Sequence, residues 1–144
     1  MIRKLKTADL DKIMSIWLNA NIEAHSFIAT EYWKDNFEAV KKMIPQAEVF
    51  VSERDDGING FIGLSRTYVE GIFVDKAARS KGIGSELLDF AKKDRAQLSL
   101  KVYKKNRFAV QFYKNRGFRI DTESLDTDTS EEEYVMVWER NGKT

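Results

Sequence analysis

The sequence predicts one α/β domain built around a single mixed sheet. Its 144 residues are enough for one ordinary domain with a full core. Hydrophobic residues make up 42% of the chain and charged residues 33%, a balance typical of globular proteins. Strand-like and helix-like segments follow one another in an order that mixes hairpins with crossovers, which favours a mixed sheet.

The first part of the chain reads as a strand followed by two helices. Residues 2–5 form a short alternating strand, and we expect Thr7 to cap a helix whose apolar positions keep helical spacing over 10–18. A second helix is expected from Thr30, and Pro45 should end it.

The remaining segments predict six further strands and two further helices. Alternating runs at 48–53 and 60–65 flank Asp56-Gly57, which is a hairpin signal. The later elements are a buried strand over 68–75, a helix opening at the glycines near 82–84, a strand over 98–103, a helix from Asn106 to a Gly117 cap, and strands near 118–120 and 134–138.

Composition excludes several classes of function. The absence of cysteine excludes a disulfide framework, a zinc–thiolate site and a cysteine nucleophile. A single histidine, His25, gives little support to a histidine metal cluster, so no metal is expected. A net charge of +1 does not favour nucleic-acid binding, and the chain has neither a membrane-length apolar run nor an apolar leader. We therefore expect a cytoplasmic protein that binds neither nucleic acid nor membrane.

The segment "RSKGIGSELLDFAK" places two glycines and two cations directly before a helix. A helix N-terminus offers unpaired N–H groups and a partial positive charge, so it attracts phosphate. Gly82 and Gly84 would let a ligand approach the backbone. On composition alone, a plain glycine-rich turn fits the segment equally well.

Two longer segments resemble the GNAT N-acetyltransferase superfamily. "IFVDKAARSKGIGSELLDFAK" is similar to its acetyl-CoA-binding segment, a strand followed by R/Q-x-x-G-x-G/A at a helix start. "LSLKVYKKNRFAVQFYKNRGF" is similar to a second signature, a strand followed by N-x-x-A-x-x-x-Y-x-x-x-G-F. With its "HSFI…YW" segment, the chain most resembles small bacterial single-domain acetyltransferases of the YiaC/YjaB type.

The resemblance implies a fold and a cosubstrate site. The GNAT fold is one mixed, mostly antiparallel sheet of six to seven strands, flanked by about four helices, with a splayed strand pair that holds acetyl-CoA. Backbone amides of the loop should bind the coenzyme A diphosphate, the preceding strand should pair with the pantetheine arm, and two residues should lie near the thioester. The implied cofactor-binding residues are Ile72, Phe73, Val74, Arg79, Ser80, Lys81, Gly82, Ile83, Gly84, Ser85, Asn106 and Tyr113.

The resemblance offers a clear candidate for the proton donor, but the glutamate that usually acts as the general base is missing. Tyr113 can protonate the departing sulfur because a phenol stays neutral at pH 7. Many relatives carry Glu on the strand before the asparagine, where this chain has Lys101, and others place Glu at the position of Tyr68. Glu70, two residues farther on, should share a face with Tyr68 and is the candidate base, although an exposed structural carboxylate fits equally well.

The acceptor site is less defined. His25, Phe27, Trp33 and Lys101 occupy the region where the family shapes its acceptor site, so they are candidate substrate-binding residues. A structural histidine and core aromatics are equally compatible with the pattern. The acidic stretch 121–133 could attract a cationic acceptor, but a solvated loop is the favoured interpretation.

Together these features predict an N-acetyltransferase that transfers the acetyl group from acetyl-CoA directly to a primary amine. The amine could belong to a protein lysine, an N-terminus or a small molecule, and a homodimer is possible. The alternative is a non-catalytic CoA-binding or regulatory domain of the same fold, and Lys101 in place of the usual glutamate is its best support.

Overall fold

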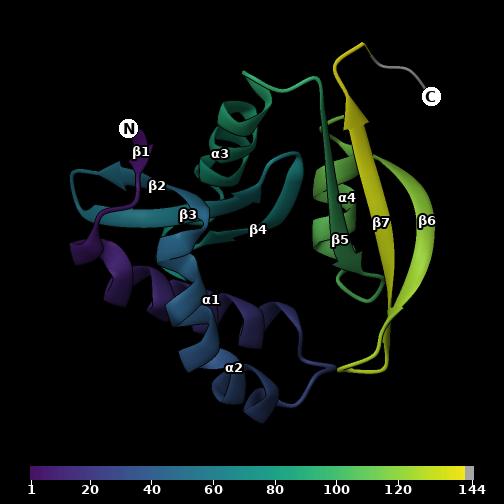
Figure 1. Cartoon of the computed structure of the whole chain (residues 1–144), viewed down its shortest axis with the longest axis horizontal. Helices are drawn as coiled ribbons and strands as arrows, with labels where there is room; N and C mark the ends of the chain where they lie inside the picture. The colour runs from purple at the N-terminus through teal and green to yellow at the C-terminus, as the bar shows by residue number, and fades with distance from the viewer. Residues whose placement is uncertain (142–144) are drawn as a thin grey trace.

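The computed structural model describes residues 1–141, and its helices and strands follow the predicted order (Figure 1). The strands are β1 (Ile2–Lys4), β2 (Glu48–Arg54), β3 (Gly57–Ser65), β4 (Tyr68–Val74), β5 (Gln97–Tyr103), β6 (Arg119–Asp126) and β7 (Glu131–Glu139). The α-helices are α1 (Leu10–Ala24), α2 (Thr30–Met43), α3 (Ile83–Lys92) and α4 (Arg107–Lys114), with short 3₁₀ turns at Thr7–Asp9, Ile44–Gln46 and Lys76–Ala78.

The seven strands form one sheet in the order β1-β2-β3-β4-β5-β7-β6, with antiparallel neighbours everywhere except between β4 and β5. The parallel pair is joined only at Tyr68–Ser99 and Val69–Leu100. Beyond these residues the two strands diverge, and the sheet opens into two halves (Figure 1). The expected mixed, mostly antiparallel sheet with a splayed strand pair is therefore confirmed.

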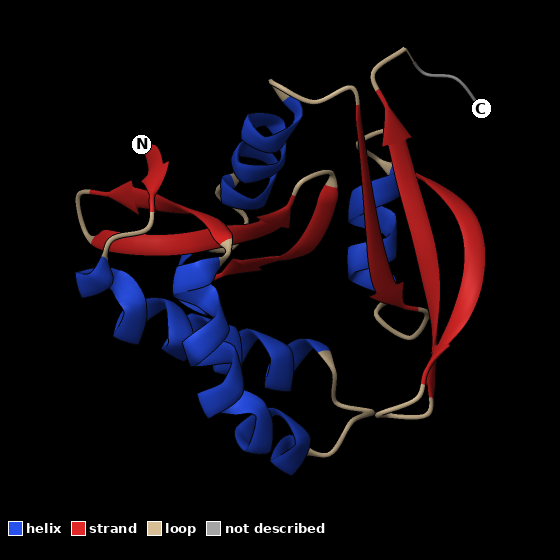
Figure 2. Ribbon diagram, viewed as in Figure 1, coloured by secondary structure: helices blue, strands red, loops and turns tan. Residues whose placement is uncertain are grey.

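Each face of the sheet carries its own hydrophobic core. Helices α1 and α2 cover one face of the β1–β4 half, α3 lies on the opposite face of that half, and α4 lies beside β5 (Figure 2). Neighbouring residues of β2 serve the two cores alternately: Val49 and Val51 pack with α1, and Phe50 packs with α3. This two-sided burial fixes the register of β2 against its neighbours β1 and β3.

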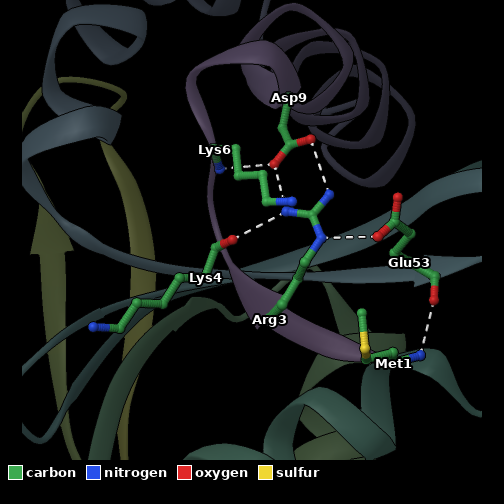
Figure 3. Close-up of polar contacts among 6 residues, drawn as sticks. All are labelled: Met1, Arg3, Lys4, Lys6, Asp9 and Glu53. Carbon is green, nitrogen blue, oxygen red and sulfur yellow. Dashed lines mark hydrogen bonds and ion pairs between the residues drawn. The ribbon is translucent and has the colours of Figure 1, made fainter.

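A partly buried ion-pair network joins β1 to β2 and to the start of α1 (Figure 3). Arg3 donates to both carboxylate oxygens of Asp9 (2.8 and 3.1 Å) and to Glu53 (2.8 Å), while the Lys6 amide donates to Asp9 (2.8 Å). The Arg3 guanidinium holds the pKa of Asp9 below its usual range. The expected Thr7 cap is wrong: α1 begins at Leu10, after a 3₁₀ turn in which Asp9 binds the Lys6 amide.

Two other sequence predictions are corrected by the structure. The β2–β3 turn is Asp55-Asp56 rather than Asp56-Gly57, because Gly57 already pairs with Arg54. The acidic stretch 121–133 is a strand hairpin, not a solvated loop, since β6 and β7 pair along it. Part of its charge is balanced by Lys104 and Lys105, which contact glutamates of both strands.

Two features are not found in the part of the chain that the structure describes. No helix among residues 1–141 is both long and apolar enough to span a bilayer. Within the same residues, no three histidine, aspartate or glutamate side chains are grouped to hold a metal ion.

Candidate active site

A cleft of about 760 Å³ lies where β4 and β5 diverge, between the end of α1 and the N-termini of α3 and α4. The cofactor-binding residues predicted from sequence that line it are Ile72, Phe73, Val74, Arg79, Ser80, Gly82, Gly84, Ser85, Asn106 and Tyr113. His25 lines it as well. Two predicted contacts do not line the cleft: Ile83 is buried in the core below α3, and Lys81 is exposed outside the cleft.

The loop before α3 has a backbone suited to an anion. Gly82 caps the helix with a left-handed φ of +78°, and Ser80 also has a positive φ of 66°. The first intrahelical hydrogen bond runs from the Glu86 amide to the Gly82 carbonyl. The backbone amides before Glu86 therefore have no hydrogen-bond acceptor within the helix. A Cβ on Gly82 would meet no atom within 4 Å, which shows that the loop borders open space. These residues fit the diphosphate of acetyl-CoA.

The arginine of this loop is already paired with a carboxylate that sequence reasoning missed. Arg79 donates to Glu23 at the end of α1, and Lys76 lies 3.7 Å from the same carboxylate. The Arg79 hydrogen bond holds the pKa of Glu23 below its usual range. Glu23 therefore remains charged in the cleft, and a phosphate that binds Arg79 would have to compete with it.

Replacing Glu23 with Gln should strengthen acetyl-CoA binding by a few-fold at most, because an exposed ion pair is weak and its loss frees Arg79 for the phosphate. Calorimetric titration of the purified variant measures this change. Glu38→Gln, at an exposed position of α2, removes the same charge away from the cleft and serves as the control. Equal or weaker binding in Glu23→Gln would show that the pair does not compete with the cosubstrate.

Tyr113 lies on α4 at the inner end of the cleft. Its ring packs edge-to-face between Phe112 (5.2 Å between ring centroids) and Phe118 (5.4 Å). Burial, and to a lesser degree the neighbouring Tyr68, raise the pKa of its hydroxyl well above the usual value. The phenol therefore stays protonated at physiological pH and is available as a hydrogen-bond donor and proton donor.

Asn106 connects α4 to the end of α1. Its side-chain oxygen accepts a hydrogen bond from the Ala109 amide (3.2 Å) and caps the helix. The amide nitrogen is therefore the group that faces His25, and it donates to Nε2 of the imidazole at 3.2 Å. The proton of a neutral His25 must then be on Nδ1, which is buried and has no hydrogen-bond partner among the described residues.

His25 belongs to an aromatic cluster rather than to a titrating site. Its ring stacks on Trp33 (5.2 Å) and contacts Tyr103 (5.1 Å) and Phe27 (5.7 Å) edge-on. Burial lowers the pKa of His25 to about 4, so the ring is neutral at physiological pH. Trp33 is a core residue whose ring stacks against His25, and neither Trp33 nor Phe27 lines the cleft. Among the four candidate acceptor residues, the structure brings only His25 to the cleft wall.

The candidate base region lies on the strands beside the split. Glu70 is exposed and occupies a bulge, because Gly71 pairs with Gly63 and Val69 pairs with Leu64. Tyr68 is half-buried, and its pKa is raised by burial and by the carboxylates of Glu70 and Glu133. Lys101 is exposed on β5. Neither Tyr68, Glu70 nor Lys101 lines the cleft itself.

Sequence reasoning missed several further residues of the cleft. Lys105, Arg107 and Phe108 line its outer part, and Phe108 is 85% exposed although it is a large apolar side chain. Arg107 and Phe108 directly follow Asn106, at positions that the N-x-x-A signature leaves open. An exposed aromatic ring on the wall of a cleft that also has cations is a surface on which a nucleotide base can stack.

Comparison with known proteins identifies the family. Residues 45–120 match the acetyltransferase (GNAT) domain. The chain is 30% identical to peptidyl-lysine N-acetyltransferase YiaC of Escherichia coli K12, covering 96% of both proteins, and 30% identical to YjaB of the same strain, covering 83% of this chain and 82% of YjaB. The solution structure of apo YjaB from E. coli superimposes with a TM-score of 0.86 at 26% identity over 96% of both chains.

The protein therefore belongs to the GNAT acetyltransferase family, as the two sequence signatures predicted. It is an N-acetyltransferase that uses acetyl-CoA as its acetyl donor. The alternative of a non-catalytic CoA-binding domain is not favoured, since both E. coli relatives are named as enzymes.

Proposed function

We propose that this protein acetylates the ε-amino group of lysine residues in other proteins. The observation that carries the proposal is the 30% identity, over 96% of both chains, to an enzyme named for peptidyl-lysine acetylation. The architecture supports it, because the cleft opens between β4 and β5, so an amine can approach from the face opposite α3 and α4.

Acetyl-CoA supplies the thioester carbonyl that the amine attacks. In the proposed complex, the amides of Ser80–Ser85 hold the diphosphate, and the backbone of Ile72–Val74 pairs with the pantetheine arm. Backbone N–H groups of β4 beyond Val69 have no β5 partner and can polarise a carbonyl oxygen. Tyr113 donates its proton to the departing sulfur.

A lysine acceptor imposes one further requirement. Its amine has a pKa of about 10.4, so roughly one molecule in 2,500 is neutral at pH 7, and deprotonation costs about 4–5 kcal/mol. A carboxylate near the acceptor reduces this cost by taking the proton. Glu70 is the candidate from sequence, either directly or through a water molecule.

Lysine peptides with blocked N-termini, incubated with acetyl-CoA and the purified protein, should gain one acetyl group on the lysine, as measured by mass spectrometry. Matched peptides with arginine in place of lysine should remain unmodified. A panel of small amines in parallel assays provides the opposing test. Acetylation of a small amine without any acetylation of lysine peptides would contradict the proposed acceptor class.

A further inference from the structure

Glu133 is a buried carboxylate whose charge has no cationic partner within residues 1–141. It is 8% exposed, and Asp9 is the other buried carboxylate of the described chain. Asp9 is neutralised by Arg3, whereas the hydrogen bond that Glu133 receives comes from the Ser124 hydroxyl at 3.2 Å. A buried charge without a counter-ion is costly and is retained where it binds or reacts with a ligand.

The sheet register places Glu133 one strand away from the split, on β7 beside β5, and outside the lining of the cleft. It lies directly opposite Tyr103 of β5 and opposite Ser124 of β6, so these three side chains form one row on the same face. Because β4 pairs with β5 only as far as Leu100, the end of β5 around Tyr103 borders the opening. Tyr103 in turn contacts His25, which lines the cleft.

The surroundings of Glu133 are mostly phenols and carboxylates, and Lys101 is the one cation among the described groups that face it. The titratable and charged groups that face it are Tyr32 from α2, Tyr68 from β4, Lys101 and Tyr103 from β5, Asp126 at the end of β6, and Asp128 in the following turn. Asp126 accepts a hydrogen bond from the Tyr103 hydroxyl at 2.5 Å. Burial and the charges of Asp126, Asp128 and Glu133 raise the pKa of Tyr32, while Glu133 also raises that of Tyr68. Glu133 therefore lies near phenols of both α2 and β4, and its neighbour Tyr103 contacts His25 at the cleft wall.

We propose that Glu133 binds the ammonium group of the acceptor lysine and accepts its proton before the acetyl group is transferred. This inference rests on the proposed function. It differs from the sequence-based candidate, since Glu70 is exposed and its charge is largely solvated.

The proton balance is complete with groups of this chain. Glu133 takes one N–H proton, and the electron pair stays on nitrogen. The neutral amine then forms the C–N bond as the C–S bond breaks, and Tyr113 gives its proton to the sulfur. The second N–H proton, lost as the amide forms, returns to Tyr113, and Glu133 releases its proton to water.

The test is Glu133→Gln, which keeps an oxygen for the Ser124 hydroxyl and removes the charge. With a lysine peptide that the wild-type enzyme acetylates, kcat/KM at pH 7 should fall at least about tenfold, while the Kd for acetyl-CoA stays within about twofold. The deficit should shrink as pH rises to 9, because the variant gains nearly tenfold per pH unit as the free amine accumulates.

Glu132→Gln is the matched control, since Glu132 is the adjacent residue, is exposed and pairs with Lys104. It should change kcat/KM by less than about twofold, and equal thermal unfolding of both variants shows that the fold is intact. An unchanged kcat/KM in Glu133→Gln, or a loss of the same size at every pH, overturns the inference. A pH-dependent loss in Glu70→Gln instead of Glu133→Gln overturns it as well.

Failure of the proposed function is distinguishable from failure of this inference. If wild-type protein acetylates small amines but no lysine peptide, the acceptor class is wrong. The same pH series, run with a small amine that the wild-type enzyme acetylates, then decides the role of Glu133. Every primary ammonium must lose a proton before its nitrogen attacks the thioester.

Discussion

Tyr113→Phe should lower kcat by about 10²-fold and leave the Kd for acetyl-CoA within about twofold. The substitution removes one hydroxyl and preserves the ring, which packs between Phe112 and Phe118. The phenol of Tyr113 is protonated at physiological pH, so it can donate a hydrogen bond, and then its proton, to the sulfur as negative charge develops there. Without that proton the thiolate is a poorer leaving group, whereas the contacts that bind the cosubstrate are unchanged. Steady-state kinetics with saturating lysine peptide, and calorimetric titration with acetyl-CoA, measure the two quantities.

Tyr134→Phe is the matched control for this change. Tyr134 lies on β7, packs against the same hydrophobic core and does not line the cleft. Its hydroxyl can be removed with little expected effect on kcat, so a loss in Tyr113→Phe alone identifies the phenol as the proton donor. A kcat within a few-fold of wild type in Tyr113→Phe would assign Tyr113 to packing.

The individual helices could be predicted because the residue pattern that forms each of them lies within one short segment of the sequence. The apolar spacing of α1 and α2 and the glycine signal before α3 are each contained in one short window of sequence. The start of α1 was misplaced because Asp9 binds the Lys6 amide while it also pairs with Arg3, and the second contact depends on β1. The backbone of the loop before α3 was predictable for the same local reason.

The acceptor side of the site could not be predicted because distant segments build it. Asn106 and His25 are 81 positions apart, and Arg79 and Glu23 are 56 positions apart. Glu133 belongs to an acidic stretch that resembles a solvated loop, and its burial follows only from the pairing of β7 with β5 and β6. Neighbouring residues of a strand face opposite sides of the sheet, so once the register is known Glu133 is expected to be buried and Glu132 exposed.

Gly82→Val should weaken acetyl-CoA binding by at least about 10²-fold. Gly82 has a φ of +78°, and a Cβ at this position would meet no protein atom within 4 Å. The added isopropyl group would therefore occupy the open space that the diphosphate needs to reach the loop amides. Losing two hydrogen bonds to a charged group costs about 3 kcal/mol or more, which corresponds to this change in Kd. Calorimetric titration with acetyl-CoA measures the change directly.

The same substitution also strains the backbone, so the binding loss must be separated from destabilisation. A β-branched residue with a left-handed backbone conformation lowers the free energy of unfolding by about 1–2 kcal/mol, whether or not it lies near a ligand. Gly57 provides the control, because it has a φ of +110°, lies in the β2–β3 hairpin away from the cleft and likewise has no atom within 4 Å of a Cβ. Gly57→Val should lower the free energy of unfolding by a similar amount and retain wild-type affinity for acetyl-CoA. Equal affinities in the two variants would contradict the diphosphate site at the start of α3, whereas a loss confined to Gly82→Val requires the ligand to touch this loop.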